Sequence, residues 1–215
     1  FIAENVALEY TLASNVAILV CTAPLFTALL ARAFLRERLK AMHWWGSVIA
    51  MSGAVVVVFN GRIVLQLDPA GDLLSLAAAV SWGGYTIITR RLGTRYSTLF
   101  ITRKVFFYGI LTLLPFLPLL PVRADAALLL SPPVLWNLLF LGVIASFACY
   151  ILWNRAIKQL GATRASNYIY LNPVVTLVTS AIVLSERVTP LAVAGMLLIL
   201  AGVYLGERRP RGSNA

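Results

Sequence analysis

Polar and aromatic side chains recur at helical spacing inside otherwise apolar stretches of the sequence. Ser146, Tyr150 and Trp153 are separated by four and three residues, which places them on one face of an α-helix. Two further series follow the same spacing: Ser75, Trp82, Tyr85 and Thr89, and then Tyr168, Asn172, Thr176 and Thr179. Any single member could equally be a packed core residue. Together, the three series predict a cavity whose hydroxyl, amide and ring groups bind a small polar molecule.

Three polar residues near the N-terminus extend this candidate substrate site. Glu4 is predicted to lie one to two turns inside an apolar helix, and Asn5 and Asn15 add amide groups nearby in the sequence. An ionisable side chain at such depth is costly unless it serves a function, and Glu4 could carry a coupling proton. The alternative is that the helix end frays and Glu4 is solvated at the interface.

The residue types that catalysis requires are not arranged in any recognisable pattern. An intramembrane enzyme would need a nucleophile with its base, paired acids at depth, or a set of metal ligands. His43 is the one histidine, and it adjoins Trp44-Trp45 at the edge of an apolar stretch, where aromatic rings anchor at the interface. Cys21 and Cys149 lie in apolar stretches without a CxxC motif and are predicted to be small packing residues. We therefore expect no catalytic residue, metal site or cofactor.

The composition defines the environment in which these residues act. Of 215 residues, 60% are hydrophobic and 12% are charged, too few charges to cover a soluble surface. Stretches without Asp, Glu, Lys or Arg occur at 10–31, 41–61, 73–89, 105–122, 126–154, 165–185 and 188–206. An α-helix crosses the hydrocarbon core with about 20 apolar residues. The sequence thus predicts an all-α integral membrane protein with seven complete spans, the fifth a single helix from about Pro133 to Asn154.

The distribution of basic residues predicts the orientation in the membrane. Segments between consecutive spans must lie on alternate sides of the membrane. One side then carries the basic residues of 32–40, 90–104, 155–164 and the tail, and the other side carries only Arg62, Arg123 and Arg187. By the positive-inside rule the base-rich side is cytoplasmic, and so is the C-terminus. The net charge of +10 therefore reflects topology, and we expect no nucleic-acid partner.

The sequence also matches itself without gaps when residues 7–59 are aligned with 156–208. The shared positions include Pro24/Pro173, Glu37/Glu186, Gly46/Gly195 and Gly53/Gly202. The second copy contains five predicted spans, an odd number, so the two copies cross the membrane in opposite senses. Inverted repeats are typical of secondary transporters, whose substrate site lies near the midplane between the halves. By the same offset, the first copy would begin about two helices and most of a third before residue 1.

The prolines, glycines and glutamates that recur in both copies have predicted structural roles. Pro24 and Pro173 are predicted to kink their helices, either as gating hinges or as plain packing kinks. The glycine pairs recur at seven-residue spacing and are predicted to allow close helix packing. Glu37 and Glu186 fall on opposite membrane faces, so they cannot act as a carboxylate pair, and a structural role in their loops is expected.

These motifs resemble those of EamA domains in the drug/metabolite transporter superfamily. In the first copy the similar stretches are Glu4-Asn5-Val6-Ala7-Leu8, Ala13-Ser14-Asn15-Val16, Ala23-Pro24-Leu25-Phe26 and Leu35-Arg36-Glu37-Arg38. In the second copy they are Ser81-Trp82-Gly83-Gly84-Tyr85, Trp153-Asn154, Asn172-Pro173 and Leu184-Ser185-Glu186-Arg187. The resemblance implies ten helices in the complete protein, both termini cytoplasmic, alternating access, and export or exchange of metabolites such as amino acids.

The combined interpretation is a polytopic helical bundle of two inverted EamA-type repeats, the first incomplete. Residues 1–60 would be the C-terminal part of the first repeat, 72–207 the complete second repeat, and 208–215 a cytoplasmic tail. The expected function is secondary transport of a small polar metabolite across the cell (inner) membrane, with a proton as the candidate coupling ion. The alternative is a non-transporting structural or receptor-like membrane protein. The sequence indicates neither the substrate nor the oligomeric state.

Overall fold

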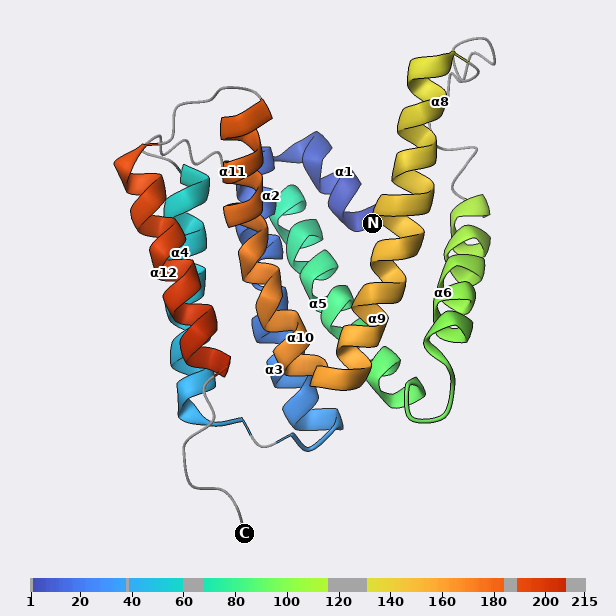
Figure 1. Cartoon of the computed structure of the whole chain (residues 1–215), viewed down its shortest axis with the longest axis horizontal. Helices are drawn as coiled ribbons and strands as arrows, with labels where there is room; N and C mark the ends of the chain where they lie inside the picture. The colour runs from blue at the N-terminus through green and yellow to red at the C-terminus, as the bar shows by residue number, and fades with distance from the viewer. Residues whose placement is uncertain (1, 38, 60–67, 116–130, 184–188, 208–215) are drawn as a thin grey trace. The chain divides into compact units, whose positions relative to one another are not determined.

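The computed structural model describes residues 2–37, 39–59, 68–115, 131–183 and 189–207, and the elements formed by these residues are helices (Figure 1). The chain divides into two compact units, which are described separately. The first unit comprises 1–88 with 162–215, and the second comprises 89–161. The predicted tail, 208–215, lies outside the described residues.

The first unit contains most of the helices. They are α1 (Ile2–Tyr10), α2 (Ala13–Val20), α3 (Ala23–Phe34), α4 (Ala41–Phe59), most of α5 (Pro69–Leu92), α10 (Ala162–Asn167), the 3-10 helix η3 (Tyr168–Leu171), α11 (Asn172–Val183) and α12 (Pro190–Glu207). The second unit holds the last turn of α5, then α6 (Thr98–Leu113), α8 (Pro132–Leu139), the π-helix η2 (Phe140–Ala148) and α9 (Cys149–Leu160).

Four helical stretches are long and apolar enough to cross a membrane within the described part of the chain. They are Asn15–Phe34, Ala41–Phe59, Pro132–Leu160 and Pro190–Glu207. The third contains the single helix expected from Pro133 onward, extended to Leu160. Of the seven predicted spans, 73–89 forms the middle of α5, 105–122 runs from α6 into residues outside the description, and 165–185 is divided among α10, η3 and α11. The chain is a multi-pass α-helical membrane protein.

A helix break precedes each of the two repeat-related prolines. α2 ends at Val20, and Pro24 lies in the first turn of α3. The 3-10 helix η3 ends at Leu171, and Pro173 is the second residue of α11. Proline is tolerated in the first turn because its missing N–H would have no partner there. The predicted kinks therefore take the form of new helix starts.

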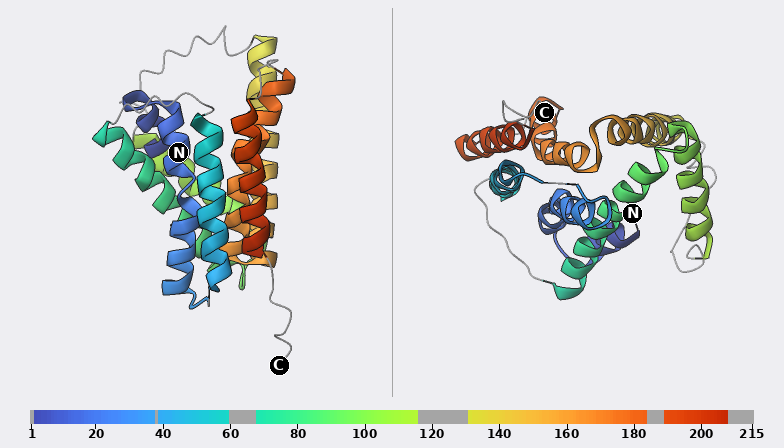
Figure 2. Two further views of the ribbon diagram at one scale, coloured as in Figure 1. Left: turned by 90° about the vertical axis from the view of Figure 1, so that its left-hand side faces the viewer. Right: turned by 90° about the horizontal axis from the view of Figure 1, so that it is seen from below.

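The closest helix packing in the first unit joins α4 to α12, which run antiparallel side by side (Figure 2). A Cβ atom built on Gly53 would lie 2.6 Å from the carbonyl oxygen of Gly195, and one on Gly195 would lie 2.9 Å from that of Gly53. Gly46 and Gly202 meet in the same way, each with its built Cβ 2.6 Å from the other's carbonyl oxygen. The glycines thus allow backbone-to-backbone contact, as their spacing predicted.

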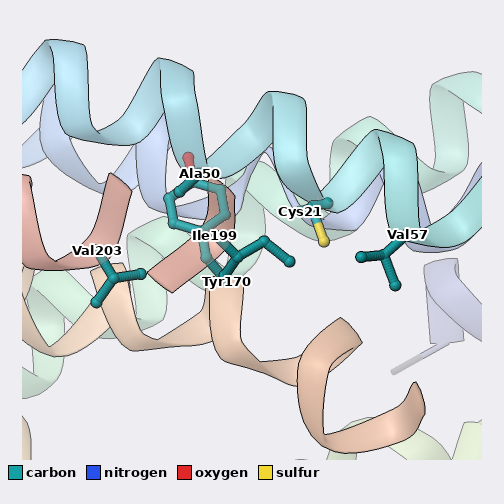
Figure 3. Close-up of a cluster of buried hydrophobic side chains, with 7 residues drawn as sticks. Cys21, Ala50, Val57, Tyr170, Ile199 and Val203 are labelled. Carbon is teal, nitrogen blue, oxygen red and sulfur yellow. The ribbon is translucent and has the colours of Figure 1, made fainter. Parts of the chain in front are cut away.

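A cluster of buried side chains lies beside this glycine interface (Figure 3). Its members come from the break after α2, from α4, from η3 and from α12: Cys21, Ala50, Ala54, Val57, Tyr170, Ile199 and Val203. Cys21 is a packing residue, as predicted. Cys149 is exposed at the start of α9, so the packing role expected for it was wrong. Half of the residues of α9, Cys149 among them, are exposed.

The predicted repeats and the two packing units have different boundaries. α12 would end the second repeat, yet it packs on α4, which would end the first. The repeat boundaries at 60 and 72 fall next to residues outside the description and stay a prediction.

Candidate substrate site

A buried polar chain lies where α1 passes into α2. α1 ends at Tyr10, and Leu12 has an extended backbone, with φ −66° and ψ 143°. The Asn15 side-chain amide donates to Thr11 Oγ1 at 3.2 Å, and Thr11 Oγ1 donates to Asp72 Oδ1 at 3.5 Å. Thr11 and Asn15 are 8% and 5% exposed. The sequence analysis identified Asn15 but missed its partners, Thr11 and Asp72.

The start of α5 is built to hold Asp72 in this position. Asp68 Oδ1 accepts hydrogen bonds from the backbone N–H groups of Ala70 and Gly71, at 2.9 and 3.1 Å, which satisfies two donors of the first turn. A Cβ atom on Gly71 would lie 2.8 Å from Thr11 Cβ, so the missing side chain lets α5 approach the helix break. The cap and the glycine together bring the carboxylate of Asp72 to Thr11.

Of the other N-terminal candidates, the structure places Glu4 half-buried and Asn5 exposed in α1. Both precede Thr11 by about two turns. Asn15 belongs to the polar chain, whereas Glu4 and Asn5 lie toward the other end of the short helix. Their predicted part in the site stays a prediction.

On α5, the structure brings Trp82 and Tyr85 together. Their ring centroids are 5.4 Å apart at an interplanar angle of 48°, and both side chains are half-buried. Ser75, from the same predicted series, is buried and donates to the carbonyl oxygen of Gly71 at 2.9 Å. It is therefore satisfied within its own helix. The aromatic pair is the part of this series that can offer ring surface to a ligand.

The third predicted series lies on an exposed face at the end of η3 and along α11. Tyr168, Asn172, Thr176 and Thr179 are all exposed, while Pro173 between them is buried. An exposed polar face on an apolar membrane helix is unfavourable against hydrocarbon. Apolar side chains of α11 such as Val175 and Ile182 are exposed as well, so the predicted place of this series in a polar cavity stays a prediction.

In the second unit, Ser146, Tyr150 and Trp153 are half-buried. Tyr150 and Trp153 lie in α9 at the expected α-helical spacing, but Ser146 lies in the π-helix, whose wider turn changes its angular position. The ring of Tyr150 meets that of Phe106 on α6 edge-on, with centroids 5.4 Å apart. Next to Trp153, the buried amide of Asn154 donates to Thr102 Oγ1 at 2.9 Å and links α9 to α6. The residue spacing gave no sign of this bond, and Asn154 stood out only as part of a motif that resembles EamA domains.

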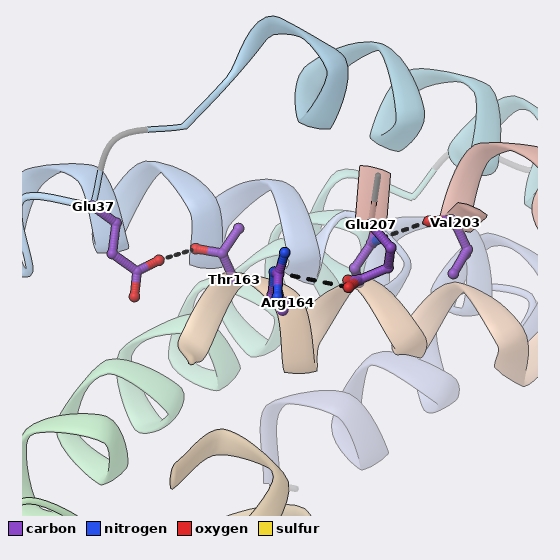
Figure 4. A network of polar contacts seen from close by, with 6 residues as sticks. Glu37, Thr163, Arg164, Val203 and Glu207 are labelled. Atoms are coloured by element: carbon purple, nitrogen blue, oxygen red, sulfur yellow. Dashed lines mark hydrogen bonds and ion pairs between the residues drawn. The ribbon is translucent and has the colours of Figure 1, made fainter. Parts of the chain in front are cut away.

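A separate polar network lies in the first unit, where α3 ends, α10 begins and α12 ends (Figure 4). Thr163 Oγ1 donates to Glu37 Oε2 at 2.6 Å. Arg164 Nε lies 3.8 Å from Glu207 Oε2, and the buried Asn167 side chain donates to the carbonyl oxygen of Val203 at 3.4 Å. Glu37 thus fixes its loop to α10, in line with the structural role expected for it. Glu186 lies outside the described residues.

Across 2–37, 39–59, 68–115, 131–183 and 189–207, no group of three or more His, Cys, Asp or Glu residues could hold a metal ion. The same part of the chain holds buried hydroxyl and amide groups and half-buried aromatic rings on apolar helices. It is a multi-pass helical membrane protein with polar groups among its helices.

The chain belongs to the EamA-like transporter family, whose model matches residues 1–59 and 69–206. Over 207 residues it is 33% identical to a probable terminal-alkyne amino-acid exporter of Streptantibioticus cattleyicolor, covering 93% of this chain and 66% of that protein. It is 30% identical to an uncharacterized transporter of Archaeoglobus fulgidus, covering 94% of this chain and 70% of that protein. The family is one of transporters rather than enzymes.

Two further comparisons add a bacterial relative and a fold. A probable amino-acid metabolite efflux pump of Escherichia coli is 26% identical over 209 residues, covering 93% of this chain and 69% of that protein. A solved crystal structure superposes with a TM-score of 0.83 at 18% identity, covering 95% of this chain and 72% of that one. The fold is therefore shared, and the chain spans about two thirds of the length of its relatives.

Proposed function

We propose that the protein to which this chain belongs is a secondary transporter that exports a small polar metabolite across the cytoplasmic membrane by alternating access. The substrate class is an amino acid or a related compound. The names of relatives support this choice, since two of them are a probable amino-acid exporter and a probable amino-acid metabolite efflux pump.

The observation that carries the proposal is the chain of Asn15, Thr11 and Asp72 at the break between α1 and α2. Buried amide, hydroxyl and carboxyl groups cost free energy in an apolar bundle unless they meet partners. A helix break inside a membrane is tolerated where the backbone is buried in protein or lines a polar cavity. In a carrier, such groups replace the hydration shell of a polar solute.

The candidate substrate-binding residues are those predicted from the sequence. Those within the first unit are Glu4, Asn5, Asn15, Trp82, Tyr85 and Asn172, and those within the second are Ser146, Tyr150 and Trp153. The amides and hydroxyls would orient the solute, and the aromatic rings would supply apolar contact. A cationic group on the substrate would gain cation–π attraction of about 1 kcal/mol. Glu4 is the candidate group for a coupling proton.

The helix breaks and the glycine interface support the alternating-access part of the proposal. Pro24 and Pro173 each follow a break, so each span has a point about which its two segments could rotate as a hinge. Gly46 contacts Gly202, and Gly53 contacts Gly195. The repeat pairs Gly46 with Gly195 and Gly53 with Gly202, so each contact is the equivalent of the other. Reciprocal contacts of this kind are typical of two-fold symmetry. Between antiparallel helices, the axis lies perpendicular to them, as an inverted repeat requires.

The proposal is tested by comparing metabolites inside and outside cells that have or lack the complete gene. Loss of the gene should raise the intracellular and lower the extracellular level of at least one amino-acid-like compound. The same compound should then accumulate in inside-out vesicles that contain the protein, and collapse of the pH gradient should reduce this uptake if a proton drives it. Identical metabolite profiles and no uptake would favour the alternative, a structural or receptor-like membrane protein.

A further inference from the structure

The described part of the second unit carries basic residues without any acidic counterpart. Residues 89–115 and 131–161 contain no Asp or Glu, and their bases are Arg90, Arg91, Arg95, Arg103, Lys104, Arg155 and Lys158. The described residues of this unit therefore carry a net positive charge, with seven bases and no acid. The first unit differs, because Arg164 lies 3.8 Å from Glu207 there.

Hydrogen bonds gather the ends of three helices of this unit. Arg90 Nη1 donates to the carbonyl oxygens of Ile157 and Lys158 in the last turn of α9, at 3.3 and 2.5 Å. Lys158 Nζ donates to the carbonyl oxygen of Tyr96, just before α6, at 3.5 Å. The last turn of α5, the beginning of α6 and the end of α9 therefore meet at one end of the unit (Figure 1). The charge distribution predicts that this end is cytoplasmic.

Two of the bases converge on one aromatic ring at the beginning of α6. Ser97 caps the helix by accepting from the N–H of Phe100 at 3.3 Å. The Arg103 guanidinium carbon lies 5.5 Å from the Phe100 ring centroid, and Lys104 Nζ lies 5.9 Å from the same centroid. Side chains on a helix lean toward its N-terminus. The Arg103 guanidinium is thus directed back toward the predicted cytoplasmic interface, and the Lys104 ammonium lies near the same ring.

An apolar face continues from these cations along α6. Lys104 Nζ also lies 5.7 Å from the ring centroid of Phe107 and 5.8 Å from that of Tyr108. These rings are 56% and 54% exposed, and Arg103 is exposed as well. Basic groups at the interface with aromatic rings one turn deeper match an amphiphilic anion, which has a charged head and an apolar body.

We propose that this face of α6 is a binding site for an anionic phospholipid. The phosphate accepts hydrogen bonds from Arg103 and Lys104, and the first part of an acyl chain lies along Phe107 and Tyr108. A planar guanidinium suits two phosphate oxygens at once, and the ammonium adds a point charge. A free phosphate would use the same cations but not the rings. A phospholipid contacts the cations with its phosphate and the rings with its acyl chain, so the site fits a phospholipid better than a free phosphate.

The test measures lipid retention by the complete protein in native mass spectrometry, with phosphatidylglycerol and phosphatidylcholine as probes. Wild-type protein should retain phosphatidylglycerol preferentially. In an Arg103→Gln/Lys104→Gln variant, retention should weaken roughly thirtyfold, as expected for the loss of two interfacial bases. The matched control is Arg32→Gln/Lys40→Gln, which removes two exposed bases from the predicted same side of the membrane but from the first unit.

Further arms separate the lipid from a simple anion. Free glycerol phosphate should fail to displace phosphatidylglycerol, and a Phe107→Ala/Tyr108→Ala variant should lose part of its retention. Displacement by glycerol phosphate would overturn the lipid assignment in favour of a free phosphate. Equal losses in the two double Gln variants, or no preference for phosphatidylglycerol in the wild type, would also overturn the proposal. If the double variant is poorly folded, Arg103→Gln alone, which changes an exposed side chain, serves as the test.

Discussion

At the scale of single residues, buried threonine hydroxyls of the first unit serve different purposes. Thr11 joins residues from two helices, because its hydroxyl both accepts from Asn15 and donates to Asp72. Thr86 donates only within its own helix, to the carbonyl oxygen of Trp82 at 2.9 Å. The Thr11 hydroxyl holds side chains of two helices in position, whereas the Thr86 hydroxyl only completes its own hydrogen bonding within α5. Sequence spacing cannot distinguish them, because the partner of Thr11 lies far along the chain.

Replacing Thr11 by Val should therefore destabilise the protein. The change keeps the side-chain volume but removes a buried hydrogen bond to Asn15 and another to Asp72, at a cost of about 1–3 kcal/mol. Thr112→Val is the matched control, since that exposed hydroxyl donates to the carbonyl oxygen of Gly109 in its own helix at 2.9 Å. Thermal unfolding in detergent should show a lower Tm for the first variant. Equal Tm values would mean that the polar chain adds no stability.

Transport itself should depend on the proposed site residues. A Trp82→Ala/Tyr150→Ala/Asn172→Ala variant removes ring surface and an amide and should reduce transport about tenfold or more, with protein levels matched by immunoblot. The control is Trp45→Ala/Trp136→Ala, which removes two rings that are 65% and 72% exposed. Undiminished transport by the triple variant would remove these residues from the site and leave the fold assignment intact.

At the scale of helices, the glycine interface between α4 and α12 dominates the first unit. A methyl group on Gly53 would meet backbone atoms of Gly195 and Ile199 at 2.6 and 2.7 Å, and backbone cannot move aside as a flexible side chain can. Gly84 on α5 has no atom within 4 Å of a built Cβ. The same residue type therefore has opposite roles on two helices of one unit.

Substituting alanine at these glycines should reveal the difference. Gly53→Ala should cost about 1–3 kcal/mol through overpacking and lower the yield of folded protein. Gly84→Ala should be neutral or slightly stabilising, because alanine is the better helix former by about 1 kcal/mol. Size-exclusion profiles and Tm measurements in detergent would check both. A Gly53→Ala variant as stable as the wild type would show that α4 and α12 can separate without loss.

The helical elements were largely predictable because apolar stretches of fixed length in a membrane leave few alternatives to a helix. The repeated prolines also indicated where helices would break. The π-helix at Phe140–Ala148 was not predictable, since its apolar sequence suits an α-helix equally well. The partners of Asn15 and Asn154 were missed for another reason. Each depends on how helices pack, and residue spacing within one helix carries no information about that.

At the scale of the whole molecule, the reciprocal glycine contacts agree with the repeat that the sequence suggested. Gly53 also approaches Ile199, and Gly202 approaches Ala50. Because Gly53 is equivalent to Gly202 and Ala50 to Ile199 in the repeat, these two contacts are equivalent as well. Charge and packing thus support an inverted arrangement independently. The distribution of basic residues predicts which end faces the cytoplasm, whereas the glycine contacts show only that α4 and α12 are oppositely directed.

Cysteine labelling should establish the orientation. In a background with Cys21 and Cys149 replaced by Ala, exposed probes at Lys40 and Arg95 should be shielded from an impermeant thiol reagent in intact cells. Probes at Ala70 and Pro133 should react. Permeabilised cells supply the control, because all four probes should then be labelled. The reverse pattern would place the base-rich side outside the cell.

The close fit of α4 against α12 also has a consequence for biosynthesis. The two helices are separated by 130 residues of chain, from Phe59 to Pro190, so α4 enters the bilayer with its glycine face uncovered. At bacterial rates of synthesis, the helix that covers it emerges on the order of ten seconds later. During that interval lipid, or a helper protein of the insertion machinery, must occupy the face of α4 that α12 will claim. Formation of this interface therefore requires α12 to displace a temporary occupant.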